Sequence, residues 1–216
     1  MKLRLAVVGA GEFGQHHIRV IRQSPRAELV AVVDSNAAHA SEVAAANGCA
    51  PFAGARELAG KIDAAIVAVP TSAHADTGCM LLESGVDVLV EKPIAPDLAS
   101  ADRLIQAAES NHRILQVGHL ERFNPAVLAL EKIVRLPLFF EIHRLSVFSP
   151  RSLDVDVVLD LMIHDLDILL SLVHGEIEEI RAAGISILTR GGTQAVWIQP
   201  SGGTDVVGVK VALHRA

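Results

Sequence analysis

Short runs of apolar, often β-branched residues alternate with longer Ala- and Leu-rich stretches of helical character over about the first 120 residues. The runs are almost continuously apolar, which is typical of strands covered on both faces. They predict strands at Leu5–Val8, Leu29–Val33, Ala64–Val69, Val86–Val90 and Ile114–Val117. The Ala- and Leu-rich stretches predict helices at Phe13–Gln23, Ala37–Ala46, Ala75–Ser84 and Asp97–Ser110. This βαβα order is typical of a parallel sheet with helices on both sides.

The pattern changes near Gly118–Leu120, where we place a domain boundary. Beyond it we expect a helix at Asn124–Val134, a strand at Phe139–Phe148 and a long helix at Val155–Val173. From Ile177 onward we expect strands separated by glycine-rich turns. The sequence therefore predicts an α/β fold: a doubly wound parallel sheet in residues 1–119, followed by an α+β unit in residues 120–216.

Composition and charge exclude several classes of protein. Half of the 216 residues are apolar and a fifth are charged, so the chain folds around a core. A net charge of −6 without a basic stripe, and 3% aromatic residues, argue against nucleic-acid binding. The apolar runs are far shorter than the roughly 20 residues of a membrane helix. Cys49 and Cys79 have no metal-ligand spacing and form no disulfide framework, so a soluble cytoplasmic protein is expected.

A glycine-rich loop follows the first predicted strand and opens the first predicted helix. It matches G-x-G-x-x-G, and its residues are Gly9, Ala10, Gly11, Glu12, Phe13 and Gly14. The first two glycines allow a tight turn and a close approach of the backbone to a diphosphate, which the amides and dipole of the helix would hold. The context predicts the dinucleotide-binding site of a Rossmann domain.

The second predicted strand ends at Asp34, twenty residues after Gly14. A carboxylate there can accept hydrogen bonds from the adenosine ribose and would repel a 2′-phosphate. Ser35, a second cofactor-binding candidate, and Asn36 follow it and supply no arginine, so NAD is expected rather than NADP. The alternative is a plain turn with Asp34 as the N-cap of the next helix.

Two further segments lie at the carboxyl ends of predicted strands, where open parallel sheets bind ligands. Glu91-Lys92-Pro93 follows the fourth strand, and Glu91 is a candidate for cofactor binding. Lys92 can stabilise charge on a substrate oxygen, or it is only a solvated lysine. Pro70, Thr71 and His74 follow the third strand and are candidates for the cofactor cleft, against helix capping by Thr71 or Ser72.

Asp160 and His164 lie in the apolar helix predicted at Val155–Val173. Their i, i+4 spacing puts both on one face, where His164 would act as general base and Asp160 would orient it or the substrate. The alternative is a buried pair that only links elements. Asp165 and Asp167 are interpreted as ordinary exposed or capping carboxylates, and His16-His17 as a solvated or packed face. No histidine or cysteine cluster implies a metal.

In combination, these motifs resemble the Gfo/Idh/MocA (glucose-fructose oxidoreductase/inositol dehydrogenase) family. The resemblance rests on Gly9–Gly14, Val69-Pro70-Thr71 with His74, Glu91-Lys92-Pro93 and Asp160-x-x-x-His164, and it covers about residues 3–188. It implies a catalytic set of Lys92, Asp160 and His164. Gly118–Pro125 is similar to the family's link between domains, which adds Arg122 and Asn124 to Lys92 and His164 as substrate-binding candidates.

Within the family, Val117–Pro125 and Leu159–Ile168 are most similar to sugar-nucleotide members such as UDP-N-acetylglucosamine 3-dehydrogenases. The resemblance implies oxidation of a secondary hydroxyl of a sugar or sugar nucleotide to a ketone. His164 would remove the proton, NAD would accept the hydride, and Lys92 would steady the oxygen.

The last residues, Thr189–Ala216, depart from the family pattern. We expect a C-terminally shortened, incomplete substrate domain, through truncation, a frameshift or natural variation, with an exposed sheet edge that could associate into a homo-oligomer. A competing hypothesis is a noncatalytic NAD-binding protein that acts as a sensor or is inactive.

Overall fold

A computed structural model of the chain describes residues 1–135, 139–146, 158–173, 177, 179–185, 195–201 and 208–215. The chain divides into two compact units, Met1–Gly118 and His119–Ala216. The division falls one residue before the boundary expected from the sequence.

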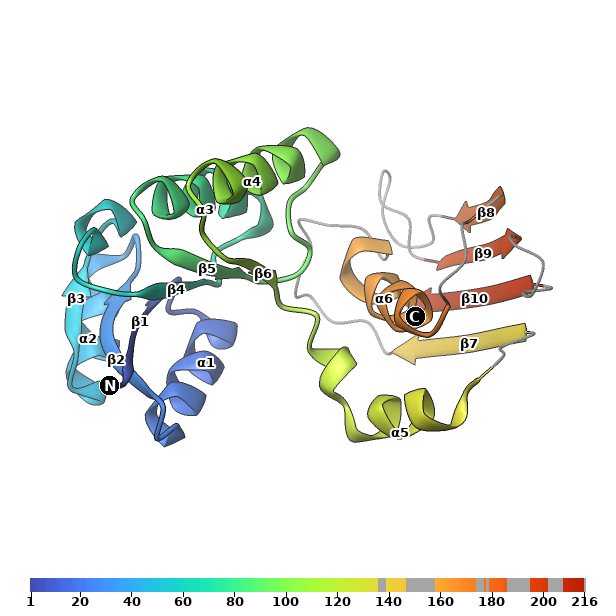
Figure 1. Ribbon diagram of the computed structural model, residues 1–216, viewed down its shortest axis with the longest axis horizontal. Helices are drawn as coiled ribbons and strands as arrows, with labels where there is room; N and C mark the ends of the chain where they lie inside the picture. The colour runs from blue at the N-terminus through green and yellow to red at the C-terminus, as the bar shows by residue number, and fades with distance from the viewer. Residues whose placement is uncertain are drawn as a thin grey trace. The chain divides into compact units, whose positions relative to one another are not determined.

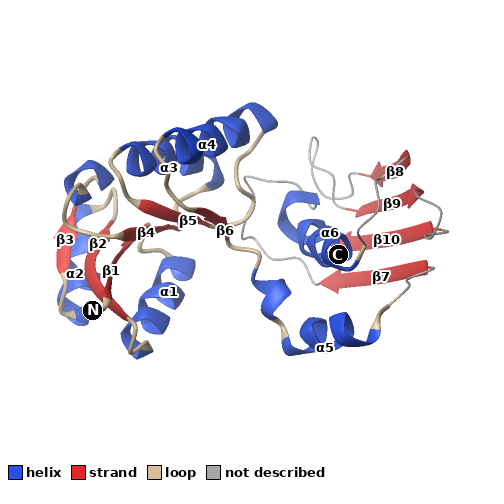
Figure 2. Ribbon diagram, in the orientation of Figure 1, coloured by secondary structure: helices blue, strands red, loops and turns tan. Residues whose placement is uncertain are grey.

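The first unit contains a six-stranded sheet in the order β3-β2-β1-β4-β5-β6, in which all the paired strands are parallel (Figures 1 and 2). The strands are β1 (Leu3–Val8), β2 (Ala27–Val33), β3 (Ala50–Phe52), β4 (Ala64–Val67), β5 (Asp87–Val90) and β6 (Leu115–Val117). The order reverses between β1 and β4, which is the switch point where doubly wound sheets bind ligands. The predicted α/β class is confirmed.

Helices cover both faces of this sheet because its side chains alternate between two apolar clusters. The helices are α1 (Glu12–Gln23), α2 (Ala37–Asn47), α3 (His74–Glu83) and α4 (Leu98–Ser110). Ile18 of α1 and Val43 of α2 pack with Val7 of β1, whereas Leu82 of α3 and Leu104 of α4 pack with Val8. Neighbouring positions of one strand therefore face different helix pairs, as strand geometry requires.

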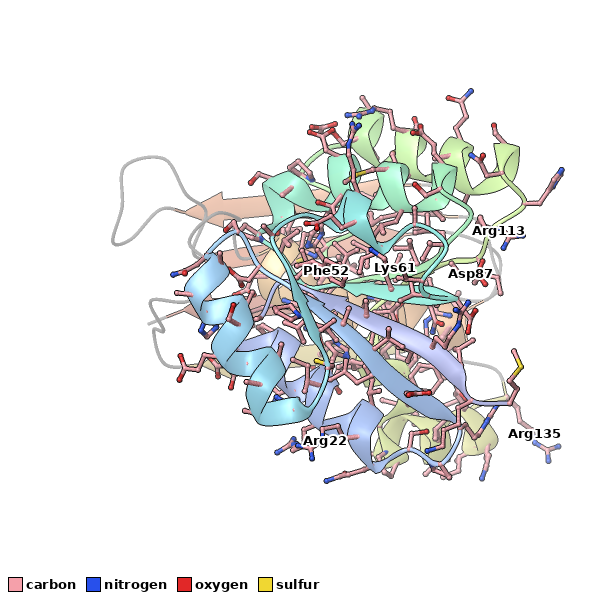
Figure 3. All side chains as sticks on the ribbon, turned by 90° about the vertical axis from the view of Figure 1, so that its left-hand side faces the viewer. Arg22, Phe52, Lys61, Asp87, Arg113 and Arg135 are labelled. Atoms are coloured by element: carbon pink, nitrogen blue, oxygen red, sulfur yellow. The ribbon has the colours of Figure 1, made fainter. Side chains whose placement is uncertain are left out.

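The short edge strand β3 is absent from the sequence prediction. It has three residues and contains Pro51, which cannot donate a ladder hydrogen bond and is tolerated at a sheet edge. Its Phe52 ring lies 4.5 Å from the Nζ of Lys61. Both residues are labelled in Figure 3. This cation–π contact places a positive charge beside a side chain of the edge strand.

The second unit begins with a 3₁₀ turn, η3 (Leu120–Phe123), and helix α5 (Pro125–Ile133). Its four-stranded sheet has the order β7-β10-β9-β8. The strands are β7 (Phe139–Ser146), β8 (Glu179–Ile185), β9 (Ala195–Ser201) and β10 (Gly208–Arg215). Residues 189–216, which the sequence pattern sets apart, thus supply two strands, and β10 lies between β7 and β9.

The long helix predicted at Val155–Val173 is not a regular α-helix throughout. A π-helical turn, η4 (Val158–Met162), leads into α6 (Ile163–Leu172). Residues 155–157 lie outside the described ranges. Met162 and Leu169 are buried in a small cluster with Phe140 of β7. Apolar residues spaced at helical intervals therefore predict the helix, but they do not distinguish a single π-helical turn from a regular α-helical turn.

A first prediction concerns Asp97, whose side chain caps α4 by accepting a hydrogen bond of 2.8 Å from the Ser100 amide. That bond lowers the carboxyl pKa. Because the folded-state pKa is lowered, the stabilisation is present above the ordinary aspartate pKa and is lost as pH falls through the folded value. We expect Asp97→Ala to lower the Tm at pH 7 and to have little effect at pH 2.5. Asp102→Ala, at an exposed position of the same helix, is the control. An equal decrease of the Tm at pH 7 in both variants would contradict the capping role of Asp97.

Candidate functional site

The glycine loop joins β1 to α1 at the switch point of the sheet. Gly9 has a φ of +95°, a conformation that favours glycine, and a Cβ there would lie 2.5 Å from the Ala68 carbonyl oxygen beyond β4. A Cβ on Gly14 would lie 1.9 Å from the Gly9 oxygen, so α1 packs directly on the turn. Gly11, by contrast, has nothing within 4 Å of such an atom. The loop is tight on its inner side and open at Gly11.

The N-terminus of α1 adds donors to this open position. Gly11 is the N-cap residue without a side-chain cap, and Glu12 and Phe13 begin the helix. The first amides of a helix lack intrahelical partners and attract anions. Phe13 is exposed, and its ring packs edge-on against that of His16. Gly11 and the first two helix residues, Glu12 and Phe13, fit a dinucleotide diphosphate.

Asp34 lies at the end of β2, beside the glycine loop. Its Oδ2 accepts a hydrogen bond of 2.9 Å from the Ala10 amide, and its Oδ1 accepts one of 2.9 Å from the Asn36 amide. The N-cap of α2 is Asn36, which accepts bonds from two helix amides, so the alternative role of Asp34 as that N-cap is wrong. Ser35 is exposed. The backbone thus holds the Asp34 carboxylate at the loop, as ribose recognition needs.

His39 of α2 also contacts the loop. Its Nε2 lies 3.0 Å from the Ala10 carbonyl oxygen, so the neighbouring helix fixes the same residue whose amide binds Asp34. No sequence motif marked His39, because the contact joins residues 29 positions apart.

The segment after β4 contains three cofactor candidates. Pro70 is exposed and precedes the 3₁₀ turn η2 (Thr71–Ala73), in which Thr71 is buried. His74 is 1% exposed, and its Nδ1 and Nε2 each lie 2.9 Å from a carbonyl oxygen, of Pro93 and Val69 respectively. Neither ring nitrogen is therefore left to bind a ligand. Helix α3 begins at His74 without a side-chain cap at Ala73.

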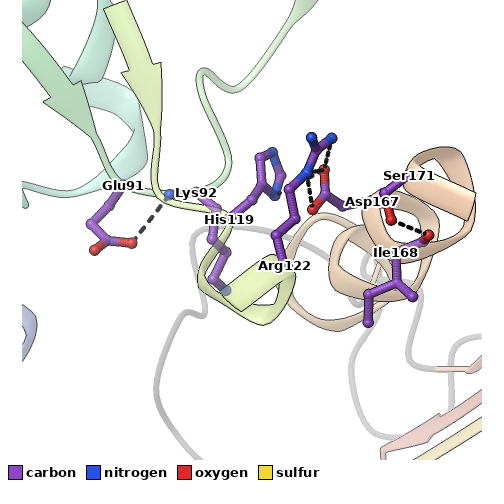
Figure 4. Close-up of polar contacts among 7 residues, drawn as sticks. All are labelled: Glu91, Lys92, His119, Arg122, Asp167, Ile168 and Ser171. Atoms are coloured by element: carbon purple, nitrogen blue, oxygen red, sulfur yellow. Dashed lines mark hydrogen bonds and ion pairs between the residues drawn. The ribbon is translucent and has the colours of Figure 1, made fainter. Parts of the chain in front are cut away.

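Glu91, Lys92 and Pro93 follow β5, and the Lys92–Pro93 peptide bond is cis. The Glu91 Oε1 lies 2.6 Å from Nε2 of His17, a residue of α1. The Glu91 Oε2 accepts a 3.3 Å hydrogen bond from the Lys92 amide (Figure 4). The carboxylate of Glu91 is thus engaged by protein groups on both oxygens. Of the two alternatives expected for His16-His17, a solvated or a packed face, His17 therefore takes the packed one.

Asp160 and His164 belong to the second unit. Asp160 lies in the π-helical turn η4 and is buried, whereas His164 lies in the first turn of α6 and is half-buried. Isolated π-helical turns are frequent at functional sites, because they change where side chains point relative to a regular helix. The expected catalytic set is therefore divided: Lys92 lies in the first unit, and Asp160 and His164 lie in the second.

Asp165 and Asp167 are buried, 1% and 7% exposed, so interpreting them as exposed or capping carboxylates was wrong. The Arg122 guanidinium donates to both oxygens of Asp167 at 2.7–2.9 Å, as Figure 4 shows. This hydrogen bonding raises the pKa of Arg122. His119 Nδ1 lies 4.0 Å from the same carboxylate. The contacts join η3 to the helix that carries His164.

The other substrate-binding candidate, Asn124, caps α5. Its Oδ1 accepts from the Ala126 amide at 3.0 Å, and its side-chain amide donates to Glu121. Asn124 and Arg122 thus both have local protein partners.

Both cysteines of the first unit are at least partly buried. Burial raises the pKa of both thiols, Cys49 and Cys79, which makes them weaker nucleophiles at neutral pH.

The described ranges contain no group of three or more ligating side chains that could hold a metal. Among the same residues, no helix is long and apolar enough to cross a membrane.

Comparisons with known proteins agree with this geometry. The profile of the Gfo/Idh/MocA family, described as an oxidoreductase family with an NAD-binding Rossmann fold, matches residues 3–119. The chain is 37% identical over 204 residues to the UDP-N-acetylglucosamine 3-dehydrogenase of Acidithiobacillus ferrooxidans, covering 94% of this chain and 64% of that protein. It is 33% identical to an inositol 2-dehydrogenase of an Arthrobacter species, covering 76% and 52%.

Solved structures show the same relationship. The UDP-N-acetylglucosamine 3-dehydrogenase of A. ferrooxidans superposes with a TM-score of 0.92 at 34% identity, covering 100% of this chain and 71% of that one. This chain therefore spans between one half and three quarters of the length of these relatives. The match over residues 3–119, more than half of the chain, shows that the chain belongs to the Gfo/Idh/MocA family of NAD-binding oxidoreductases.

Proposed function

We propose that this protein is an NAD-dependent dehydrogenase that oxidises a secondary hydroxyl of a sugar or sugar nucleotide, with UDP-N-acetylglucosamine as the leading substrate. The glycine loop, with its open position at Gly11 and the anchored carboxylate of Asp34, is the observation that carries the proposal. Lys92, Asp160 and His164 provide the groups that the chemistry needs. The substrate class rests on the relatives' printed names.

In the reaction, the alcohol loses a hydride from carbon and a proton from oxygen, and a ketone forms. A bound nicotinamide dinucleotide supplies the hydride acceptor. His164 takes the hydroxyl proton as general base. Asp160 orients the imidazole or the substrate. The ammonium group of Lys92 donates a hydrogen bond to the substrate oxygen and stabilises the negative charge that develops there.

The activity is tested by incubating the purified chain with NAD and a panel of UDP-sugars and polyols while NADH absorbance is followed. We expect turnover of a UDP-sugar, with the highest kcat/KM for UDP-N-acetylglucosamine. NAD binding without turnover of any panel member would contradict the dehydrogenase and favour a noncatalytic NAD-binding protein.

We also propose that Asp34 selects NAD over NADP, because its carboxylate can bind ribose hydroxyls and repels a 2′-phosphate. A hydrogen bond to a charged group contributes about 1.5–3 kcal/mol, so Asp34→Ala should weaken NAD binding by roughly 10- to 100-fold and reduce the preference over NADP. Calorimetric Kd values for both dinucleotides measure this. Glu42→Ala, at an exposed position of α2, is the control. An unchanged ratio of the two Kd values would remove this role from Asp34.

A further inference from the structure

Two histidines from different helices hold the residues on either side of Lys92. His17 contacts the Glu91 side chain, and His74 contacts the Pro93 carbonyl oxygen. Neither contact is within one helix or one turn, since they join residues 74 and 19 positions apart. Lys92 is therefore the central residue of a segment that is anchored on both sides.

The His17 contact connects the lysine segment to the helix of the glycine loop. The Nε2–Oε1 distance is 2.6 Å, and the side chains of His17 and Glu91 are only 16% and 10% exposed. Low exposure keeps water from competing for the bond. His17 lies one turn after Gly14, which packs on the glycine loop itself. A shift of α1 would therefore be transmitted to Glu91.

The Glu91 carboxylate is also confined by the end of β6. A Cβ on Gly118 would lie 2.9 Å from Oε2 and 3.2 Å from the carboxyl carbon of Glu91, so only glycine leaves room for the side chain in this position. The same Oε2 accepts the Lys92 amide. Packing and hydrogen bonding together fix the peptide that leads into Lys92.

His74 holds the other side of the lysine. Its ring lies between the Pro93 and Val69 carbonyl oxygens, at 2.9 Å from each. Val69 follows β4 and Pro93 follows β5, and these strands are paired neighbours. The ring thus cross-links the two segments that leave adjacent strands. α1 and α3 pack on opposite faces of the sheet, so the two histidines belong to opposite layers.

We propose that His17 and His74 are positioning residues that set the backbone of Lys92 relative to the glycine loop. The inference rests on the proposed role of Lys92 in the reaction. Positioning a catalytic group changes the rate more than the binding of cofactor, and a displacement of about 1 Å can cost up to about 100-fold. Loss of either histidine should therefore lower kcat and leave the Kd for NAD almost unchanged.

The test for His17 compares two adjacent histidines of α1. His17→Ala should lower kcat at least tenfold and accelerate hydrogen–deuterium exchange in residues 91–95 of the cofactor-free protein. His17→Gln keeps an N–H donor for Glu91. It should therefore have a higher kcat and slower exchange in residues 91–95 than His17→Ala. His16→Ala, at an exposed position that faces Phe13, should leave both unchanged. Equal exchange in the His16 and His17 variants would overturn the proposal.

His74→Phe keeps an aromatic ring but removes both ring nitrogens and thus both contacts, and it should also lower kcat and speed exchange in residues 91–95. Should the variant fold poorly, His17→Ala carries the same test from the other helix. Lys92→Ala separates the proposed catalytic role of Lys92 from the proposed positioning role of the two histidines. Activity retained without Lys92 would contradict its catalytic role, while the exchange measurement would still decide whether the histidines hold the segment. An inactive Lys92→Ala beside a His17→Ala with wild-type kcat would overturn the positioning role alone.

Discussion

Replacing His164 with alanine is expected to lower kcat for the oxidation by roughly 10²- to 10⁴-fold, the usual contribution of a positioned general base. The Kd for NAD should stay within about twofold, because His164 lies in the second unit and the glycine loop lies in the first. Steady-state kinetics with the best substrate of the UDP-sugar panel, together with calorimetric NAD titration, measure both quantities.

Two controls make this prediction specific. Ser171→Ala alters another polar residue of α6, whose hydroxyl donates to the Ile168 carbonyl oxygen, and should keep kcat near the wild-type value (Figure 4). Imidazole added to the buffer should restore part of the rate of His164→Ala, since it can accept the proton in place of the side chain. Wild-type rates in His164→Ala would rule out the proposed base.

The second large effect is expected at the glycine loop, where two glycines serve different purposes. Gly14→Ala would place a methyl group against the Gly9 carbonyl oxygen, at 1.9 Å without a backbone shift. Overpacking of this kind costs roughly 1–3 kcal/mol, so both the free energy of unfolding and the affinity for NAD should fall. Chemical denaturation and calorimetry give the two values.

Gly11→Ala is the matched variant. Its added methyl group meets nothing within 4 Å, and the Gly11 φ of −65° is accessible to alanine. Stability should therefore be unchanged, whereas NAD binding should weaken, because the methyl group stands where the diphosphate approaches the backbone. An unchanged Kd for NAD in Gly11→Ala would contradict the diphosphate site. Wild-type stability of Gly14→Ala would contradict the predicted overpacking and show that the backbone of the turn shifts to accommodate the methyl group.

Hydrophobic patterning predicted most elements of the first unit because the inner strands β1, β4 and β5 are largely buried on both faces, and helices such as α1 and α4 have one apolar face. The bounds differ by a few residues; β4, for example, ends at Val67 and not at Val69. β3 was missed because a three-residue edge strand with a proline has no apolar run. The π-helical turn at Asp160 was missed because its apolar spacing over one turn resembles that of an α-helix.

The amino-acid sequence alone determined the doubly wound sheet, the glycine loop and the acid at the end of β2, since these depend on local spacing and on backbone conformations that few residues adopt. Only the tertiary structure decided which polar side chains meet. His17 and Glu91 are 74 positions apart in the sequence, and Arg122 and Asp167 are 45 positions apart. No local sequence pattern therefore predicts either contact. Burial makes such pairing necessary, because a polar group removed from water must find a partner, and chain folding selects that partner.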